Sequence, residues 1–278
     1  MIRLVKIFQV GRDRFRRYSR FYQKTKSWLR RHPQLRNILI WIFIFYLKSK
    51  EWIQREKVSK RQKFWFYSGH IVRWWHILKW LQGEHKKCLQ VGGGRHLKSG
   101  QEWLNGDLIA GDIYLDATKK LPFPDDSLDV IFTEQFFEHL SQEDGLHFLK
   151  EAYRVLKCGG ILRQSTPDLE GLVTVYQDKN KLVSQAEAVS RHIQNHRKST
   201  PYARATGCQF INDLFRLWGH KFLYDKETLE AITKEVGFKK FRWVNFGESD
   251  NPNLKNLERH ANVEWMKNAF VMIYEAEK

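Results

Sequence analysis

The chain has 278 residues, 42% of them hydrophobic, and a formal net charge of +17. This length and composition allow one full-sized globular domain with an extension, and the 14% aromatic content with 11 Trp excludes a wholly disordered chain. The three cysteines, Cys88, Cys158 and Cys208, lie far apart. Their number and spacing argue against a disulfide framework and a cysteine zinc site, and they favour a reducing compartment.

The basic residues are concentrated near the N-terminus. Residues 1–80 contain 21 Lys and Arg against 3 Asp and Glu, whereas residues 81–278 contain 27 against 28. Seven of the 11 Trp also fall within the first 80 residues. The sequence therefore predicts a basic, aromatic-rich, helical N-terminal region over residues 1–84, followed by a nearly neutral domain over residues 85–278.

A run of ten apolar residues, Ile38–Leu47, interrupts the basic region. A membrane-spanning helix needs about 20 apolar residues, and Arg36 and Lys48 close the run on both sides, so a transmembrane helix is not predicted. A secretory signal is not predicted either, because Arg3 and Lys6 interrupt the first apolar positions and no small-residue cleavage site follows.

The segment Phe64–Leu81 has the period of an amphipathic helix. The apolar stripe consists of Phe64, Tyr67, Ile71, Trp74, Trp75, Leu78 and Leu81, and His70, Arg73, His76 and Lys79 fall on the other side. Aromatic residues beside cations suit the headgroup depth of an anionic membrane, so residues 12–81 are predicted to bind a membrane surface. The alternatives are a cap helix that packs on the following domain and an arm that binds nucleic acid.

From Lys86 onward, short apolar strands alternate with amphipathic helices. Strands are predicted at Cys88–Val91, Trp103–Asp107, Ile113–Asp116, Leu128–Thr133, Ile161–Ser165, Lys240–Phe246 and Phe270–Glu275. Helices are predicted at Glu143–Leu156, stopped by Gly159-Gly160, and at Asp225–Val236, between an Asp225 N-cap and Gly237. Such alternation predicts an α/β fold with a parallel sheet, in which ligands bind beyond the carboxyl ends of the strands.

Three ordered segments carry a family resemblance: CLQVGGGRHLKSGQEWLNGDL, DIYLDATKKLPFPDDSLDVIFTEQFFEHL and FLKEAYRVLKCGGILRQSTPDLEGL. They resemble a class I S-adenosylmethionine-dependent methyltransferase, and most of all the methyltransferase type 11-like bacterial group associated with cell-surface polysaccharide genes. The closing segments LFRLWGHKFLYDKETLEAITKEVGF and FGESDNPNLKNLERH are similar to that group too. The resemblance covers about residues 86–278. It implies a Rossmann-like, doubly wound, mostly parallel seven-stranded sheet, with a substrate-side insertion at about 178–222.

The resemblance implies that S-adenosyl-L-methionine is the cofactor and assigns residues to its methionine part. Gly92 and Gly94 match the glycines that turn beneath it. Gln90 stands where many members have Asp or Glu, so a carboxylate contact is missing or supplied elsewhere. His96 stands where the third glycine of the motif usually lies.

The next strand ends match the residues that hold the rest of the cofactor. Asp107 would accept hydrogen bonds from the ribose hydroxyls, since a carboxylate suits two vicinal donors. Asp116, with Ala117, would face the adenine amino group. The residues that follow the fourth strand, Thr133, Glu134 and Gln135, would face the transferred methyl group.

A hydroxyl acceptor benefits from a general base within hydrogen-bond reach. His220, in WGHKF, is ranked first and His139, in EHL, second, with Glu134 and Asp168 as further candidates. No metal site is predicted, because the four-residue spacing of His192 and His196 is not accompanied by an HExxH pattern.

These observations lead to the hypothesis of a cytoplasmic methyltransferase, peripheral to the membrane, that O-methylates a glycan or lipid-linked saccharide in polysaccharide biosynthesis. One alternative is an RNA methyltransferase with a basic N-terminal clamp. The other is a catalytically degenerate scaffold in a glycan-assembly complex, for which Gln90 and His96 are the sequence support.

Overall fold

The computed structural model describes residues 73–178, 207–262 and 270–278. The chain divides into two compact units, Met1–Lys63 and Phe64–Lys278, and all described residues belong to the second. The second unit begins before the predicted boundary at residue 85. The predicted apolar run Ile38–Leu47 lies outside the described residues, as do His192 and His196. Within the described ranges, no helix has both the length and the apolar character needed to cross a membrane.

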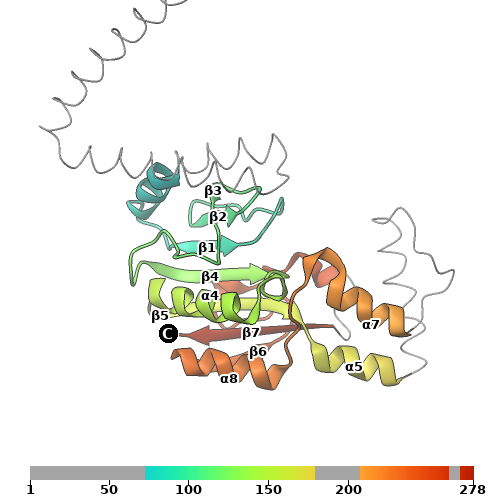
Figure 1. Cartoon of the computed structure of the whole chain (residues 1–278). Coiled ribbons are helices and arrows are strands. Elements are labelled where there is room, and N and C mark those ends of the chain that lie inside the picture. Colours follow the sequence, from blue (N-terminus) through green and yellow to red (C-terminus); the bar gives the residue numbers. More distant parts are fainter. Residues whose placement is uncertain (1–72, 179–206, 263–269) are drawn as a thin grey trace, which may run out of the picture. The chain divides into compact units, whose positions relative to one another are not determined.

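A seven-stranded sheet forms the centre of the described unit, in the order β3-β2-β1-β4-β5-β7-β6. Its strands are β1 (Cys88–Val91), β2 (Trp103–Asp107), β3 (Ile113–Tyr114), β4 (Leu128–Glu134), β5 (Leu156–Pro167), β6 (Lys239–Val244) and β7 (Val271–Glu277). The first five strands are parallel, and β7 runs antiparallel to both β5 and β6. Figure 1 shows β7 pointing against β1 and β4. The predicted mostly parallel, Rossmann-like sheet is confirmed.

The helices that follow in chain order are α4 (Gln142–Val155), α5 (Leu169–Gln177), α7 (Gly207–Arg216) and α8 (Lys226–Val236). Short 3-10 turns cover Phe137–His139 (η1), Leu217–Gly219 (η2), Pro252–Leu254 (η3) and Arg259–Asn262 (η4). In Figure 1, α5 and α7 lie beyond the end of the sheet toward which β4 points. Side chains of these two helices share a small apolar core, made by Leu172, Val175, Phe210, Leu214, Leu223 and Phe270.

Local sequence accounts for the two helices whose ends were predicted most closely. Asp225 accepts a hydrogen bond from Thr228 N–H at the start of α8, and Gly237 ends the helix with a φ of 119°. Ser141 caps α4 in the same way, through Asp144 N–H. The predicted end of α4 at Leu156 is confirmed to within one residue, but Gly159-Gly160 do not stop the helix, because they lie within β5, which begins at Leu156.

Residues 73–81 are helical and pack on the sheet through a face that the sequence pattern did not identify. Ile77 and Trp80 are 1% and 8% exposed and belong to the main core, whereas Trp74 and Trp75 of the predicted apolar stripe are 54% and 60% exposed. Arg73, assigned to the polar side, is half-buried and donates to the Tyr114 carbonyl. Ile77 and Trp80 thus make this segment part of the domain, while the exposed Trp pair faces solvent.

Candidate functional site

The turn after β1 has the backbone geometry that its glycines predict. Gly92 and Gly94 have φ values of 72° and 58°, a region that side chains rarely occupy. A Cβ atom on Gly92 would also overlap the ring of Phe136, which follows β4. The turn after β1 and the segment after β4 therefore approach each other at the carboxyl edge of the sheet, closely enough to require glycine.

Gln90 holds this loop in shape. Its side-chain Nε2 donates to the His96 carbonyl over 3.0 Å, and its Oε1 accepts from Lys98 N–H over 3.0 Å. Asn105 Oδ1 accepts from the same Lys98 N–H over 2.8 Å. The amide of Gln90 therefore fixes a six-residue turn that a carboxylate, which has no donor, could not close in this way. His96, at the third glycine position, contributes backbone groups to the turn.

Asp107 lies at the end of β2 and connects two loops. Its Oδ2 accepts from Gly94 N–H over 2.9 Å, and its Oδ1 accepts from Ile109 N–H over 2.8 Å. A carboxylate has about four acceptor positions, so two remain for a ligand. These contacts bring Asp107 next to the glycine turn, as the predicted ribose contact requires.

Asp116 and Ala117 follow β3 at the same edge. Asp116 Oδ1 accepts from the backbone N–H and the hydroxyl of Thr118, over 3.0 and 2.8 Å. Asp116 is half-buried, while Ala117 is buried. The local turn thus fixes the Asp116 side chain and leaves it able to meet a polar edge such as an adenine amino group.

Buried polar groups without partners gather at the ends of β4 and β5. Thr133 pairs in register with Gln164, and Glu134 with Ser165. Five side-chain atoms there have no hydrogen-bond partner among the residues that the structure describes. They are the Thr133 hydroxyl, both amide atoms of Gln164, the Ser165 hydroxyl and Gln135 Nε2. Because unpaired buried polar atoms are costly, these atoms fit a bound polar molecule. The glycine turn and Asp107, at the same edge of the sheet, fit the methionine and ribose parts of S-adenosylmethionine.

Glu134, predicted to face the transferred methyl group, makes its polar contacts with the closing segment of the chain. Its Oε1 accepts from the backbone N–H of His260 over 3.1 Å and lies 2.8 Å from His260 Nδ1. Its Oε2 lies 3.8 Å from Arg259 Nε. The carboxylate is therefore engaged by η4. Arg259 and His260 were not predicted as partners from the sequence, although the closing LERH segment was part of the resemblance.

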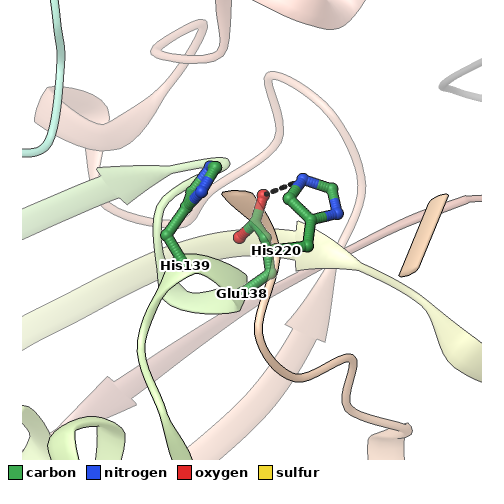
Figure 2. A group of neighbouring side chains, drawn as sticks. All are labelled: Glu138, His139 and His220. Atoms are coloured by element: carbon green, nitrogen blue, oxygen red, sulfur yellow. Dashed lines mark ion pairs between the residues drawn. The ribbon is translucent and has the colours of Figure 1, made fainter. Parts of the chain in front are cut away.

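The two predicted catalytic histidines come together, with a carboxyl group between them that the sequence analysis did not select. The rings of His139 and His220 lie 5.0 Å apart, centroid to centroid. Glu138 Oε1 lies 3.9 Å from His220 Nε2, and Glu138 Oε2 accepts from the Thr166 hydroxyl over 3.1 Å. Figure 2 shows Glu138 between the two rings. We call Glu138, His139 and His220 the EHH cluster.

Burial sets the protonation of the EHH cluster. Complete burial raises the pKa of Glu138 to about 8, against the hydrogen bond from Thr166. Burial also lowers the pKa of His139 and His220, in each case against a backbone hydrogen bond, to Gly219 and to Leu214 respectively. At neutral pH both histidines are therefore uncharged, and each can accept a proton.

Asp168, the remaining candidate base, has a structural role. It is the N-cap of α5, where its Oδ1 accepts from Glu170 N–H over 3.0 Å. Burial is the main cause that raises its pKa. Asp168 does not belong to the EHH cluster, in which the ligand atoms of all three residues lie within 4.8 Å of one another.

The sheet order with an antiparallel β7, the glycine turn after β1 and the carboxylate that ends β2 define a class I, S-adenosylmethionine-dependent methyltransferase domain. Residues 95–163 match the family model described as Methyltransferase domain. This partial match and the fold confirm the resemblance to the class I methyltransferases. The narrower resemblance to the polysaccharide-associated group stays a prediction.

Curated relatives cover part of the chain. The "Ubiquinone/menaquinone biosynthesis C-methyltransferase UbiE" of Vibrio parahaemolyticus serotype O3:K6 is 30% identical over 154 residues, which are 54% of this chain and 53% of that protein. The same-named protein of Vibrio campbellii has the same identity and coverage. The chain spans about half the length of these relatives. Among solved structures, a SAM dependent methyltransferase from Archaeoglobus fulgidus is similar, with a TM-score of 0.40 and 17% identity over 83% of this chain and 99% of that chain.

Proposed function

We propose that the chain transfers a methyl group from S-adenosylmethionine to a hydroxyl of a glycan or lipid-linked saccharide at a membrane surface. The observation that carries the proposal is the EHH cluster, which brings two uncharged histidines to the edge of the sheet where the glycine turn lies. A hydroxyl acceptor needs a base, whereas an acceptor with a free lone pair, such as an amine, does not.

When bound, the cofactor supplies an electrophilic methyl group on a sulfonium sulfur. His220 is the first candidate base, because its Nδ1 lies 2.6 Å from the Leu214 carbonyl. That carbonyl can only accept, so Nδ1 carries the proton and Nε2 keeps its lone pair for the acceptor hydroxyl. His139 is the second candidate. Asp107, Gly94 and Gln90 hold the loop against which the cofactor would be aligned, and alignment is a major part of the rate in such a displacement.

The exposed face of helix 73–81 supports the membrane part of the proposal. Trp74, Trp75 and Leu78 are all more than half exposed, and Arg73 and Lys79 lie over the two Trp rings at 5.6 and 5.1 Å. Amphipathic aromatic rings beside cations favour the interface of an anionic bilayer. A lipid-linked acceptor would be found at such a surface.

The curated relatives support a second candidate. Their name describes C-methylation in ubiquinone and menaquinone biosynthesis. By that analogy, the acceptor would be a ring carbon of a lipid-soluble quinone precursor. This candidate shares the membrane surface with the first and differs in the atom that receives the methyl group.

The test is methyl transfer from radiolabelled S-adenosylmethionine by the full chain, with lipid-linked glycans, quinone precursors and RNA offered separately. Label in a glycan as an alkali-stable ether, lost in His220→Ala, is the expected result. Label only in a quinone ring or only in RNA would overturn the glycan proposal.

Membrane binding has its own test, in flotation with vesicles that contain anionic lipid. The double variant Trp74→Glu/Trp75→Glu should stay unbound while remaining folded, because both side chains are exposed. Tyr176→Glu, which changes an exposed aromatic of α5, is the matched control and should still float. Equal flotation of the Trp variant and the control would contradict the proposed role of the exposed Trp pair.

A further inference from the structure

The EHH cluster contains a buried carboxyl oxygen, Glu138 Oε1, that lies near both histidines and makes no hydrogen bond to the described residues. The Glu138 side chain is 1% exposed, and its Oε1 has no hydrogen-bond partner among the described residues. The nearest polar atom recorded for it is His220 Nε2, at 3.9 Å, which is too far for a hydrogen bond. Folding leaves such an oxygen unpaired at considerable cost, which indicates that a group absent from the protein chain completes the site.

Both histidines are oriented by the backbone in the manner of metal ligands. His220 Nδ1 lies 2.6 Å from the Leu214 carbonyl, and His139 makes a backbone hydrogen bond with Gly219. A carbonyl on one ring nitrogen fixes the proton there and leaves the other nitrogen as a lone-pair donor. Metal-binding histidines are held by this second contact in most sites.

We propose that Glu138, His139 and His220 bind a divalent transition-metal ion, for which Zn²⁺ is the probe. All three ligand atoms lie within 4.8 Å of one another. Tetrahedral zinc, with bonds of about 2.0–2.2 Å, holds its ligand atoms roughly 3.3 Å apart, so side-chain shifts of about 1 Å close the site. Two imidazole nitrogens and one carboxylate oxygen are a known zinc ligand set and leave a fourth position open.

The donor types argue against the hard cations Mg²⁺ and Ca²⁺, which prefer oxygen ligands. The three ligands come from two segments that are far apart in the sequence, so the site forms only when the chain folds. Glu138 and His139 belong to η1, directly after β4, and His220 comes from the segment after α7, with the Lys221 and Phe222 backbone N–H groups bound to the Glu138 carbonyl. These backbone contacts keep His220 beside η1 across about 80 residues of sequence.

The site goes beyond the proposed methyl transfer and does not depend on it. A bound cation would occupy the same nitrogens that were proposed as the general base, so the two roles exclude each other at any moment. With the cation bound, an acceptor hydroxyl at the open fourth position would be made more acidic by the charge of the metal. Cation binding can be measured without any acceptor.

The experiment is a calorimetric titration of Zn²⁺ into the full chain after dialysis against a chelator. We expect one equivalent to bind with a dissociation constant of micromolar or lower. Glu138→Gln, His139→Ala and His220→Ala should each weaken binding at least 10-fold. His147→Ala on α4 removes a half-buried histidine outside the cluster and is the matched control, which should bind as the wild type does.

Cobalt provides an independent readout, because a tetrahedral Co²⁺ site of this ligand set absorbs strongly in the visible range. We expect the His139→Ala variant to lose this spectrum. Because the removed side chain is only half-buried, the variant should still fold. Absence of stoichiometric binding by the wild type, or equal binding by wild type and His139→Ala, would overturn the metal site. S-adenosylmethionine titrated into the same samples reports the cofactor site separately, so a failed metal site and a failed methyl-transfer proposal are told apart.

Discussion

Arg163 Nε donates to Glu258 Oε1 over 2.6 Å, and both side chains are completely buried. Arg163 Nη1 also donates to Glu275 Oε1 of β7 over 2.5 Å. Glu258 directly precedes Arg259 and His260 in the chain. The buried pair therefore ties the segment that engages Glu134 to the middle of β5, and a structural ion pair supports the edge of the site.

Removal of Glu258 is expected to leave the Arg163 charge partly unpaired in the interior. Breaking a buried pair from one side costs about 3–5 kcal/mol, so Glu258→Ala should lower the free energy of unfolding by about that amount in urea titrations. Lys234→Ala breaks the exposed Lys234–Glu230 pair within α8 and is the control, with an expected loss below about 1 kcal/mol. Equal losses in the two variants would contradict the role assigned to the buried pair.

Gly92→Ala tests the close approach of the turn after β1 to Phe136. Gly159 has a φ of 76°, close to the 72° of Gly92, but open space surrounds it. Gly159→Ala should therefore cost only the backbone strain of about 1–2 kcal/mol, whereas Gly92→Ala should add about 1–3 kcal/mol of steric overlap. Thermal unfolding of both variants measures the difference.

Phe136→Ala combined with Gly92→Ala provides the check on this interpretation. Loss of the ring should recover the steric part of the cost, so the two substitutions should be less destabilising together than the sum of their separate effects. Strict additivity of the two effects would mean that the Gly92 turn does not meet the Phe136 ring.

Asp107→Ala is expected to weaken binding of S-adenosylmethionine by about 1–3 kcal/mol, since it removes a charged acceptor and releases Gly94 N–H. Calorimetric titration of the cofactor measures the change, roughly 10- to 100-fold in the dissociation constant. Asp125→Ala removes an exposed carboxylate that pairs with Arg154 and should bind normally. Unchanged affinity of Asp107→Ala would show that the ribose contact is assigned to the wrong residue.

The buried strands could be predicted from sequence because a short apolar run of about four to seven residues, bounded by turn residues, is typical of a strand buried on both faces. Cys88–Val91 is completely buried in the structure, as its composition requires. Helix 73–81 could not be oriented in the same way, since Trp residues occur on two of its faces and only contact with the sheet selects Ile77 and Trp80.

The EHH cluster shows the same limit for the site. His139 and His220 were selected separately, by motif and by position, but their meeting depends on the backbone bonds between the segment after α7 and η1. Glu138 was overlooked because a Glu beside a selected His has no spacing signal of its own. The turn of Glu134 toward His260 likewise follows from the path of the closing segment, which composition does not reveal.

The contribution of Glu134 to stability depends on pH. Burial alone would raise the pKa of this carboxyl group, but hydrogen bonds from the ring and backbone of His260 outweigh it, and the pKa lies below its ordinary value of 4.5. A carboxyl with a depressed folded pKa stabilises the fold above its unfolded pKa, and this contribution is lost as the pH falls through the folded value. The cations Arg259 and Lys98 also interact with Glu134 and favour its charged form.

Glu134→Gln should therefore be less stable than the wild type at pH 7, by about 1–3 kcal/mol for hydrogen bonds to a charged group. The difference should narrow as the pH falls below about 4.5, the ordinary glutamate value, because the wild-type carboxyl then takes up a proton. Urea unfolding of both proteins between pH 3 and pH 7 measures this. A difference in the free energy of unfolding that stays constant across the pH range would mean that the charge of Glu134 does not contribute to stability. Its contacts with η4 would then stabilise the fold by packing alone.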